Sequence, residues 1–143
     1  MKPKTNFRKA SLILLIFTIS LMGCSSLKNK KFKSTNLNHF KLIVEKTNEG
    51  IKMQSIEGSA WINLAFSINN YQPQAIDEYG MTELNKISSV KDSNLADFLF
   101  TVTKTENGIV LKGIKGMAWT DLSFSLSENG KQAIDQFGMT KLN

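Results

Sequence analysis

Hydrophobic and polar residues alternate over short stretches of this chain, and a period of two is typical of half-buried β-strands. Two stretches show the alternation clearly: Phe40, Leu42 and Val44, and later Phe98, Phe100 and Val102. Second strands are predicted over residues 51–56 and 109–114. Third strands follow, with inward side chains at Leu64, Phe66 and Ile68 and at Leu122, Phe124 and Leu126. The pattern predicts a mainly β protein.

Glycine-containing turns separate these strands. Asn48-Glu49-Gly50 and Glu106-Asn107-Gly108 each offer a glycine that can adopt positive φ, and Ser127-Glu128-Asn129-Gly130 is a further candidate turn. The fourth segment, residues 74–81 and 132–139, is ambiguous. A strand would complete a four-stranded meander, whereas a short helix would start near Pro73 and end at Gly80. We favour the strand.

The chain contains a tandem duplication. Shifting the sequence by 58 residues aligns residues 46–85 with 104–143 without a gap and gives 20 identities in 40 positions. Such self-similarity indicates two copies of one structural unit. Each copy alone buries too little apolar surface to be stable without disulfides or metals. We therefore expect two tandem four-stranded units that share one core, as a compact sandwich or barrel with pseudo-twofold symmetry; two weakly coupled lobes are the alternative.

The first 24 residues carry a targeting signal. Four basic residues precede an apolar run, residues 10–22, whose 13 residues fall short of the roughly 20 that a membrane-spanning helix needs. Leu21-Met22-Gly23-Cys24 then resembles the lipobox of bacterial lipoproteins. That resemblance implies cleavage before Cys24, acylation of its thiol, and a membrane anchor in the cell envelope. Ser25 and Ser26 differ from the acidic inner-membrane retention signal, which favours the outer membrane.

The domain organisation follows from the signal and the duplication. We predict a signal peptide at 1–23, a lipidated tether at 24–38, the first β-module at 39–85, a linker at 86–97 and the second β-module at 98–143. Cys24 is the only cysteine, so an intramolecular disulfide is impossible and the modules must fold on their core alone.

The formal net charge of +6 does not describe the modules. Four positive charges belong to the signal, and Lys28, Lys30, Lys31 and Lys33 follow the lipid site. Residues 39–143 contain ten lysines against twelve acidic residues, so no basic face suited to nucleic acid is expected. The lysine cluster can contact anionic lipid headgroups or act as a solvated tether.

Two residue pairs at equivalent repeat positions are candidates for function. Trp61 and Trp119 are out of phase with the inward-facing positions, so they either bind a sugar ring or partner loop, or cover one end of the core beside a glycine. Asp77 and Asp135 offer two carboxylates for acid–base hydrolysis of a glycoside, against a purely structural role in a turn or strand ladder.

Other chemistry finds little support in the sequence. His39 is the only histidine, its counterpart in the second copy is Asp97, and the thiol is expected to be acylated. A zinc site needs about four ligands, and no phosphate-binding glycine loop is present. We predict no metal, no cofactor and no catalytic set.

The repeated pattern Gly-x-Ala-Trp-x-x-Leu-x-Phe resembles that of small uncharacterised bacterial proteins, a resemblance that implies no activity. The leading hypothesis is a non-enzymatic envelope lipoprotein that binds or scaffolds an envelope protein or glycan. A carbohydrate-active hydrolase using Asp77 and Asp135, or an inhibitor or immunity-type lipoprotein, are the alternatives.

Overall fold

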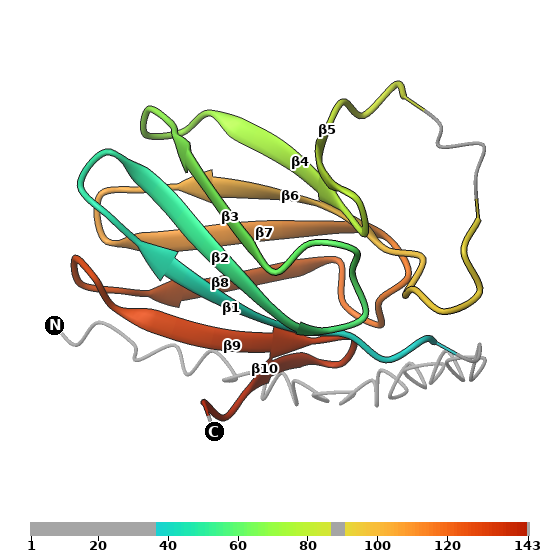
Figure 1. Cartoon of the computed structure of the whole chain (residues 1–143). Coiled ribbons are helices and arrows are strands. Elements are labelled where there is room, and N and C mark those ends of the chain that lie inside the picture. The colour runs from blue at the N-terminus through green and yellow to red at the C-terminus, as the bar shows by residue number, and fades with distance from the viewer. Residues whose placement is uncertain (1–36, 87–90, 143) are drawn as a thin grey trace, which may run out of the picture. The chain divides into compact units, whose positions relative to one another are not determined.

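The computed structural model describes residues 37–86 and 91–142, which form ten β-strands and no helix (Figure 1). The first repeat contributes β1 (Lys41–Lys46), β2 (Gly50–Glu57), β3 (Asn63–Ser67), β4 (Pro73–Asp77) and β5 (Gly80–Thr82). The second repeat contributes β6 (Leu99–Lys104), β7 (Gly108–Lys115), β8 (Asp121–Ser125), β9 (Lys131–Asp135) and β10 (Gly138–Thr140). Every strand of the second repeat begins and ends 58 residues after its counterpart, as the duplication predicts.

The ambiguous fourth segment is confirmed as extended structure, but it forms two strands. In the first repeat β4 and β5 pair antiparallel, with Ala75 opposite Thr82 and Asp77 opposite Gly80, and Glu78-Tyr79 connects them. The second repeat builds the same hairpin from β9 and β10. Each unit therefore has five strands, one more than predicted.

The two repeats exchange strands. One sheet has the order β10-β9-β1-β2-β3 and the other β5-β4-β6-β7-β8. Three strands of one repeat are thus completed by the terminal hairpin of the other, through the β1–β9 and β4–β6 pairings. The sheets are fully antiparallel and related by a pseudo-twofold axis, so neither repeat forms a sheet by itself.

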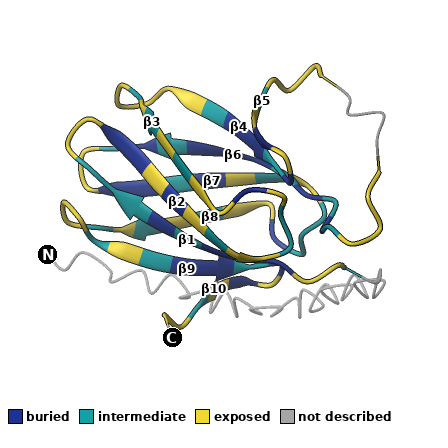
Figure 2. Cartoon of the chain, in the orientation of Figure 1, coloured by how far each residue is buried: buried dark blue, intermediate teal, exposed yellow. Residues whose placement is uncertain are grey.

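The sheets pack face to face as a sandwich, and the alternative of a closed barrel is wrong (Figure 2). Alternate residues of the central strands point inward and are essentially inaccessible to solvent, as predicted for half-buried strands. The largest fully buried side chains include Phe40, Leu42, Phe98 and Phe100. Phe40 and Phe98 meet across the axis with ring centroids 4.8 Å apart.

The contacts across the axis define two ends of the sandwich. Phe40 and Phe98 lie where the central strands begin, and Lys46 and Lys104 lie where they end. Because Lys104 reaches the carbonyl of Thr47, the ends of β1 and β6 are also neighbours, so the two strands run in the same direction. We call the end that holds residues 37–40 the proximal end and the end with the β1–β2 and β6–β7 turns the distal end.

The predicted turn glycines Gly50 and Gly108 are required for a different reason than expected. Neither has a positive φ. A Cβ on Gly50 would lie 1.9 Å from the carbonyl oxygen of Phe66, and one on Gly108 would lie 2.1 Å from that of Phe124. The third strand of each repeat therefore approaches too closely for a side chain at these positions.

Candidate functional site

Asp77 and Asp135 hold turns, and the structure separates them into different sheets. Oδ1 of Asp77 accepts hydrogen bonds from the backbone N–H groups of Tyr79 at 2.8 Å and Gly80 at 3.0 Å. Asp135 bonds to Phe137 and Gly138 in the same way, at 2.7 and 3.0 Å. This is the Asx-type turn that aspartate favours. The geometry corresponds to the structural reading of the pair rather than to a shared acid–base site.

Trp61 and Trp119 belong to the core cluster, with only 9% and 8% of their surfaces exposed. Each indole Nε1–H donates to the backbone carbonyl of the turn aspartate of its own repeat, at 3.0 Å to Asp77 and 2.9 Å to Asp135. The interpretation of an exposed aromatic pair is therefore wrong. The connection between the second and third strands breaks the alternation and turns both rings inward.

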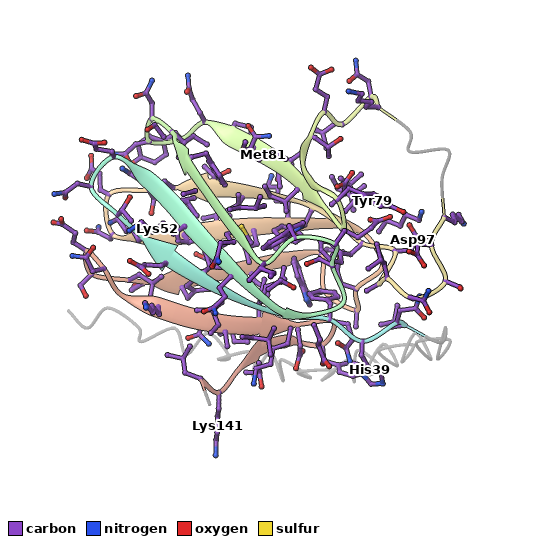
Figure 3. The ribbon with its side chains drawn as sticks, in the orientation of Figure 1. His39, Lys52, Tyr79, Met81, Asp97 and Lys141 are labelled. Atoms are coloured by element: carbon purple, nitrogen blue, oxygen red, sulfur yellow. The ribbon has the colours of Figure 1, made fainter. Side chains whose placement is uncertain are left out.

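His39 lies at the proximal end, where its Nδ1 is 2.9 Å from Nε2 of Gln136 (Figure 3). Oε1 of Gln136 accepts the N–H of buried Phe40 at 3.2 Å, so this buried amide tethers the start of β1 to the β9–β10 turn. Within the described residues, no three His, Cys, Asp or Glu side chains group as metal ligands. Cys24, the signal peptide and residues 24–36 of the tether lie outside the described part of the chain.

Glu78 occupies the position of Gln136 in the first repeat and is likewise buried, with 6% exposure. Burial raises the pKa of its carboxyl, and the neighbouring carboxylates of Asp77 and Asp97 raise it further. Asp97, the counterpart of His39, pairs with Lys115 at 2.5 Å and with Lys91 at 3.6 Å (Figure 3). The hydrogen bond from Lys115 is the main reason that the pKa of Asp97 is lowered.

A cavity of about 650 Å³ opens at the distal end. It lies between the β1–β2 and β6–β7 turns and the chain segments that follow β3 and β8. All but one of the residues that line it are polar: Lys46, Thr47, Asn48, Asn70, Lys104, Thr105, Glu106, Asn107, Ser125, Leu126, Ser127 and Glu128. Hydroxyls and amides dominate this surface, so it can exchange many hydrogen bonds with a polar ligand.

Two equivalent lysines form a reciprocal clasp within this cavity. Lys104, only 7% exposed, donates to the carbonyl of Asn48 and, at 3.3 Å, to that of Thr47. Lys46 donates to the carbonyl of Glu106 in the opposite turn. Each repeat thus uses its lysine to hold the other repeat's hairpin.

The lysine ammonium groups have donors that the clasp does not use, although Lys104 is almost fully buried. An ammonium has three donors. Among the described residues, these contacts use one donor of Lys46 and two of Lys104, and neither lysine belongs to an ion pair. Glu106 and Glu128 line the same cavity but are exposed, so their carboxylates lie in contact with solvent. The cavity combines cationic donors, neutral amides and acidic side chains that solvent reaches.

The sequence analysis missed this cavity. Lys46 and Lys104 are identical at equivalent positions, as are Thr47 and Thr105, and that identity was the available signal. Strand exchange, which the sequence does not reveal, is what brings the two turns together.

No protein-family model matches this chain, and no curated protein or solved structure shows significant similarity to it. Within the described residues, the structure has no helix long and apolar enough to span a bilayer.

Proposed function

We propose that this chain is a lipid-anchored protein of the bacterial envelope whose sandwich binds another envelope component without converting it chemically. The lipobox-like sequence ending at Cys24 supports the anchor, since two or three acyl chains hold a protein on a bilayer almost permanently. Ser25 and Ser26 favour the outer membrane as its location. The ligand class is a protein or a glycan.

The position of the distal cavity is the observation that carries this proposal. The described chain begins at the proximal end, so an anchor upstream of Leu37 attaches to that end. The cavity lies at the opposite end of β1, beside Lys46. An anchor at Cys24 would therefore leave the cavity open to the periplasm or the exterior, as a tethered binding protein requires.

The lining of the cavity supports binding rather than catalysis. Its side chains are lysines, amides, hydroxyls and exposed glutamates, which suit a polar ligand held by many hydrogen bonds. The two acids considered for hydrolysis lie elsewhere, at the proximal ends of β4 and β9, where backbone N–H groups occupy one oxygen of each.

A photocrosslinking experiment tests the proposal in intact cells. A benzophenone amino acid replaces Asn107 in the cavity lining or, as the matched control, exposed Lys112 on β7. We expect one discrete adduct from position 107, sensitive either to protease or to a glycan hydrolase, and none from position 112. Asn70→Trp, which places a bulky side chain in the cavity lining, should reduce that adduct.

Two results would contradict the proposal. Equal, diffuse crosslinking from both positions would show that the cavity has no preferred ligand. An intact mass corresponding to an uncut or unacylated chain would remove the anchor, even if the cavity adduct formed.

A further inference from the structure

Large apolar side chains are exposed at the proximal end of the sandwich. Ile62 is 71% exposed, Phe137 69%, Ile114 52% and Ile56 51%. Each lies in, or within two residues of, a connection at this end: the β2–β3 and β7–β8 connections and the β9–β10 turn. Tyr79, in the equivalent β4–β5 turn at the proximal end, is 41% exposed (Figure 3).

The exposure of Ile56 and Ile114 is built into the strands. Lys41 pairs with Glu57 and Leu42 with Ser55, so Ile56 is the unpaired residue of a β-bulge. Ile114 is the corresponding residue between Gly113 and Lys115 in the other sheet. A bulge redirects a side chain from the regular alternation. Both repeats use it to present an isoleucine at the same end.

The symmetry brings these side chains to one level. The pseudo-twofold axis runs along the central strands, because β1 and β6 begin together at the proximal end and end together at the distal end. Equivalent residues such as Ile56 and Ile114 therefore lie at equal heights along that axis. A planar surface perpendicular to the axis can contact both repeats at once.

The distal end differs in this respect. Of the large hydrophobic residues that are exposed in the described chain, only Tyr71 lies in a distal connection; Met81, Met139, Leu84 and Leu142 lie in or after the edge strands β5 and β10. The two ends of the sandwich therefore differ in chemistry: apolar residues are exposed at the proximal end, and the polar cavity lies at the distal end. Grouped exposed apolar residues indicate an interaction surface.

The geometry points to a lipid bilayer as the occupant of the proximal end, with the tips of Ile62 and Phe137 in the headgroup region and the axis roughly normal to the membrane. This inference rests on the proposed anchor at Cys24. Twelve residues separate Cys24 from Leu37, so a fully extended tether spans at most about 45 Å. The tether joins the sandwich at this end, so the anchor is attached nearer to the apolar tips than to the distal end.

Three of the acidic side chains at the proximal end have internal partners, whereas Glu57 and Asp121 at the same end are exposed. The carboxylates of Asp77 and Asp135 each accept two backbone hydrogen bonds, and Asp97 is paired with Lys115 and Lys91. These internal partners reduce the cost of bringing the acids close to headgroups. The tether lysines, Lys28, Lys30, Lys31 and Lys33, add attraction to anionic lipid.

Spin labelling tests the orientation on the full chain, purified in acylated form and reconstituted in vesicles of phosphatidylethanolamine and phosphatidylglycerol. Cys24 is the only native cysteine and acylation blocks it, so an introduced cysteine is labelled uniquely. Labels are placed at Ile62 and Phe137, with Tyr71 and Asn107 at the distal end as matched controls. The measured quantity is the accessibility of each label to oxygen divided by its accessibility to a water-soluble nickel chelate. We expect this ratio to be several-fold higher at 62 and 137 in vesicles than for the same labels in aqueous solution. At 71 and 107 the ratio should stay unchanged.

The outcomes separate this inference from the proposed function. Anchored, acylated protein whose labels at 62 and 137 stay as water-accessible as those at 71 and 107 would overturn the orientation and leave the anchor intact. Dipolar broadening between labels at 137 would identify a second copy as the occupant and also overturn it. Failure of the anchor itself is seen separately, as an unacylated mass.

A second variant checks the role of the side chains themselves. Ile62→Thr introduces the residue found at the equivalent position, Thr120, so the fold should tolerate it. Combined with Phe137→Ser, it should lower the oxygen accessibility of a label at Ile114 several-fold, whereas Tyr71→Ser should not. An unchanged signal at 114 in the double variant would show that the apolar tips do not hold this end on the membrane.

Discussion

At the scale of single residues, the two repeats differ in charge where their terminal turns meet the start of the opposite central strand. Gln136 faces His39 in one half, and Glu78 lies near Asp97 in the other. The amide of Gln136 carries no charge and forms hydrogen bonds with its neighbours. The buried carboxyl of Glu78, in contrast, must either ionise beside other acids or keep its proton. The duplication thus provides an internal comparison for the cost of one buried charge.

Glu78→Gln should stabilise the protein at neutral pH. The pKa of Glu78 is raised in the folded state, so the folded chain binds more protons than the unfolded chain above the ordinary value of 4.5. Stability is therefore lost as pH rises from that value through the raised pKa. The variant removes this loss, so its unfolding free energy should exceed that of the native protein at pH 7 and match it well below pH 4.5.

Urea unfolding across this pH range measures the effect, with exposed Glu83→Gln as the charge-matched control. Asp97 works in the opposite direction, because its lowered pKa contributes stability that is lost as pH falls through its own titration, below the ordinary 3.8. The pH range in which Glu78 changes the stability therefore does not overlap with that of Asp97. A difference between the Glu78→Gln and native proteins that persisted below the ordinary pKa would assign the effect to packing instead.

Residue-scale function was the hardest property to predict from the sequence. Asp77 and Asp135 were recognised as equivalent, and one of the two readings, a structural role in turns, agrees with their hydrogen bonds. The burial of Trp61 could not be inferred from alternation, because the five residues between β2 and β3 follow no strand period. The clasp of Lys46 and Lys104 depends on contacts between repeats, which no local pattern encodes.

At the scale of elements, the strands themselves were predictable. The first and third strands of each repeat show a period-two pattern, turn signals separate the strands, and the repeat offset allowed each assignment to be compared between the two copies. The alternation did not resolve the β4–β5 hairpin, since its strands of five and three residues are too short to show a separate period. The turn glycines were correctly placed for the wrong reason, because close approach between strands is a tertiary effect.

Gly50→Ala should be strongly destabilising. Its Cβ would lie 1.9 Å from the carbonyl oxygen of Phe66, a backbone atom that cannot rotate away. Relief requires β2 and β3 to separate, which would break their hydrogen bonds, so we expect a loss of about 3 kcal/mol or more in unfolding free energy.

Thermal and urea unfolding provide the measurement. Ala65→Ser, at an exposed position of β3, is the matched control. Ser123 already occupies the equivalent position of β8, so the substitution should be nearly neutral. A Gly50→Ala protein with native stability would mean that β3 can shift without cost, contrary to the close packing described here.

At the scale of the whole molecule, strand exchange means that both repeats are needed to form either sheet. The β1–β9 and β4–β6 pairings each join five residue pairs of different repeats, and the Phe40 ring packs against that of Phe98 across the axis. The sequence predicted a shared core but not the exchange, because the 58-residue offset is the same whether each hairpin returns to its own repeat or crosses to the other. The domain boundaries at 39–85 and 98–143 mark sequence repeats, whereas each sheet combines both.

The exchange predicts how the protein responds to cutting between its repeats. Cleavage at a protease site inserted in the 86–97 connection should leave both fragments in one folded particle, since each sheet holds strands of both. Separated in denaturant, neither fragment should regain cooperative unfolding, because β1–β3 without β9–β10 and β4–β5 without β6 expose the core faces and unpaired edges. Mixing the fragments should restore native circular dichroism and elution volume.

The same insertion left uncut is the control. A first-repeat fragment that folded alone as a monomer would require its terminal hairpin to return to its own β1, and the exchanged topology would then not be the one that the sequence needs.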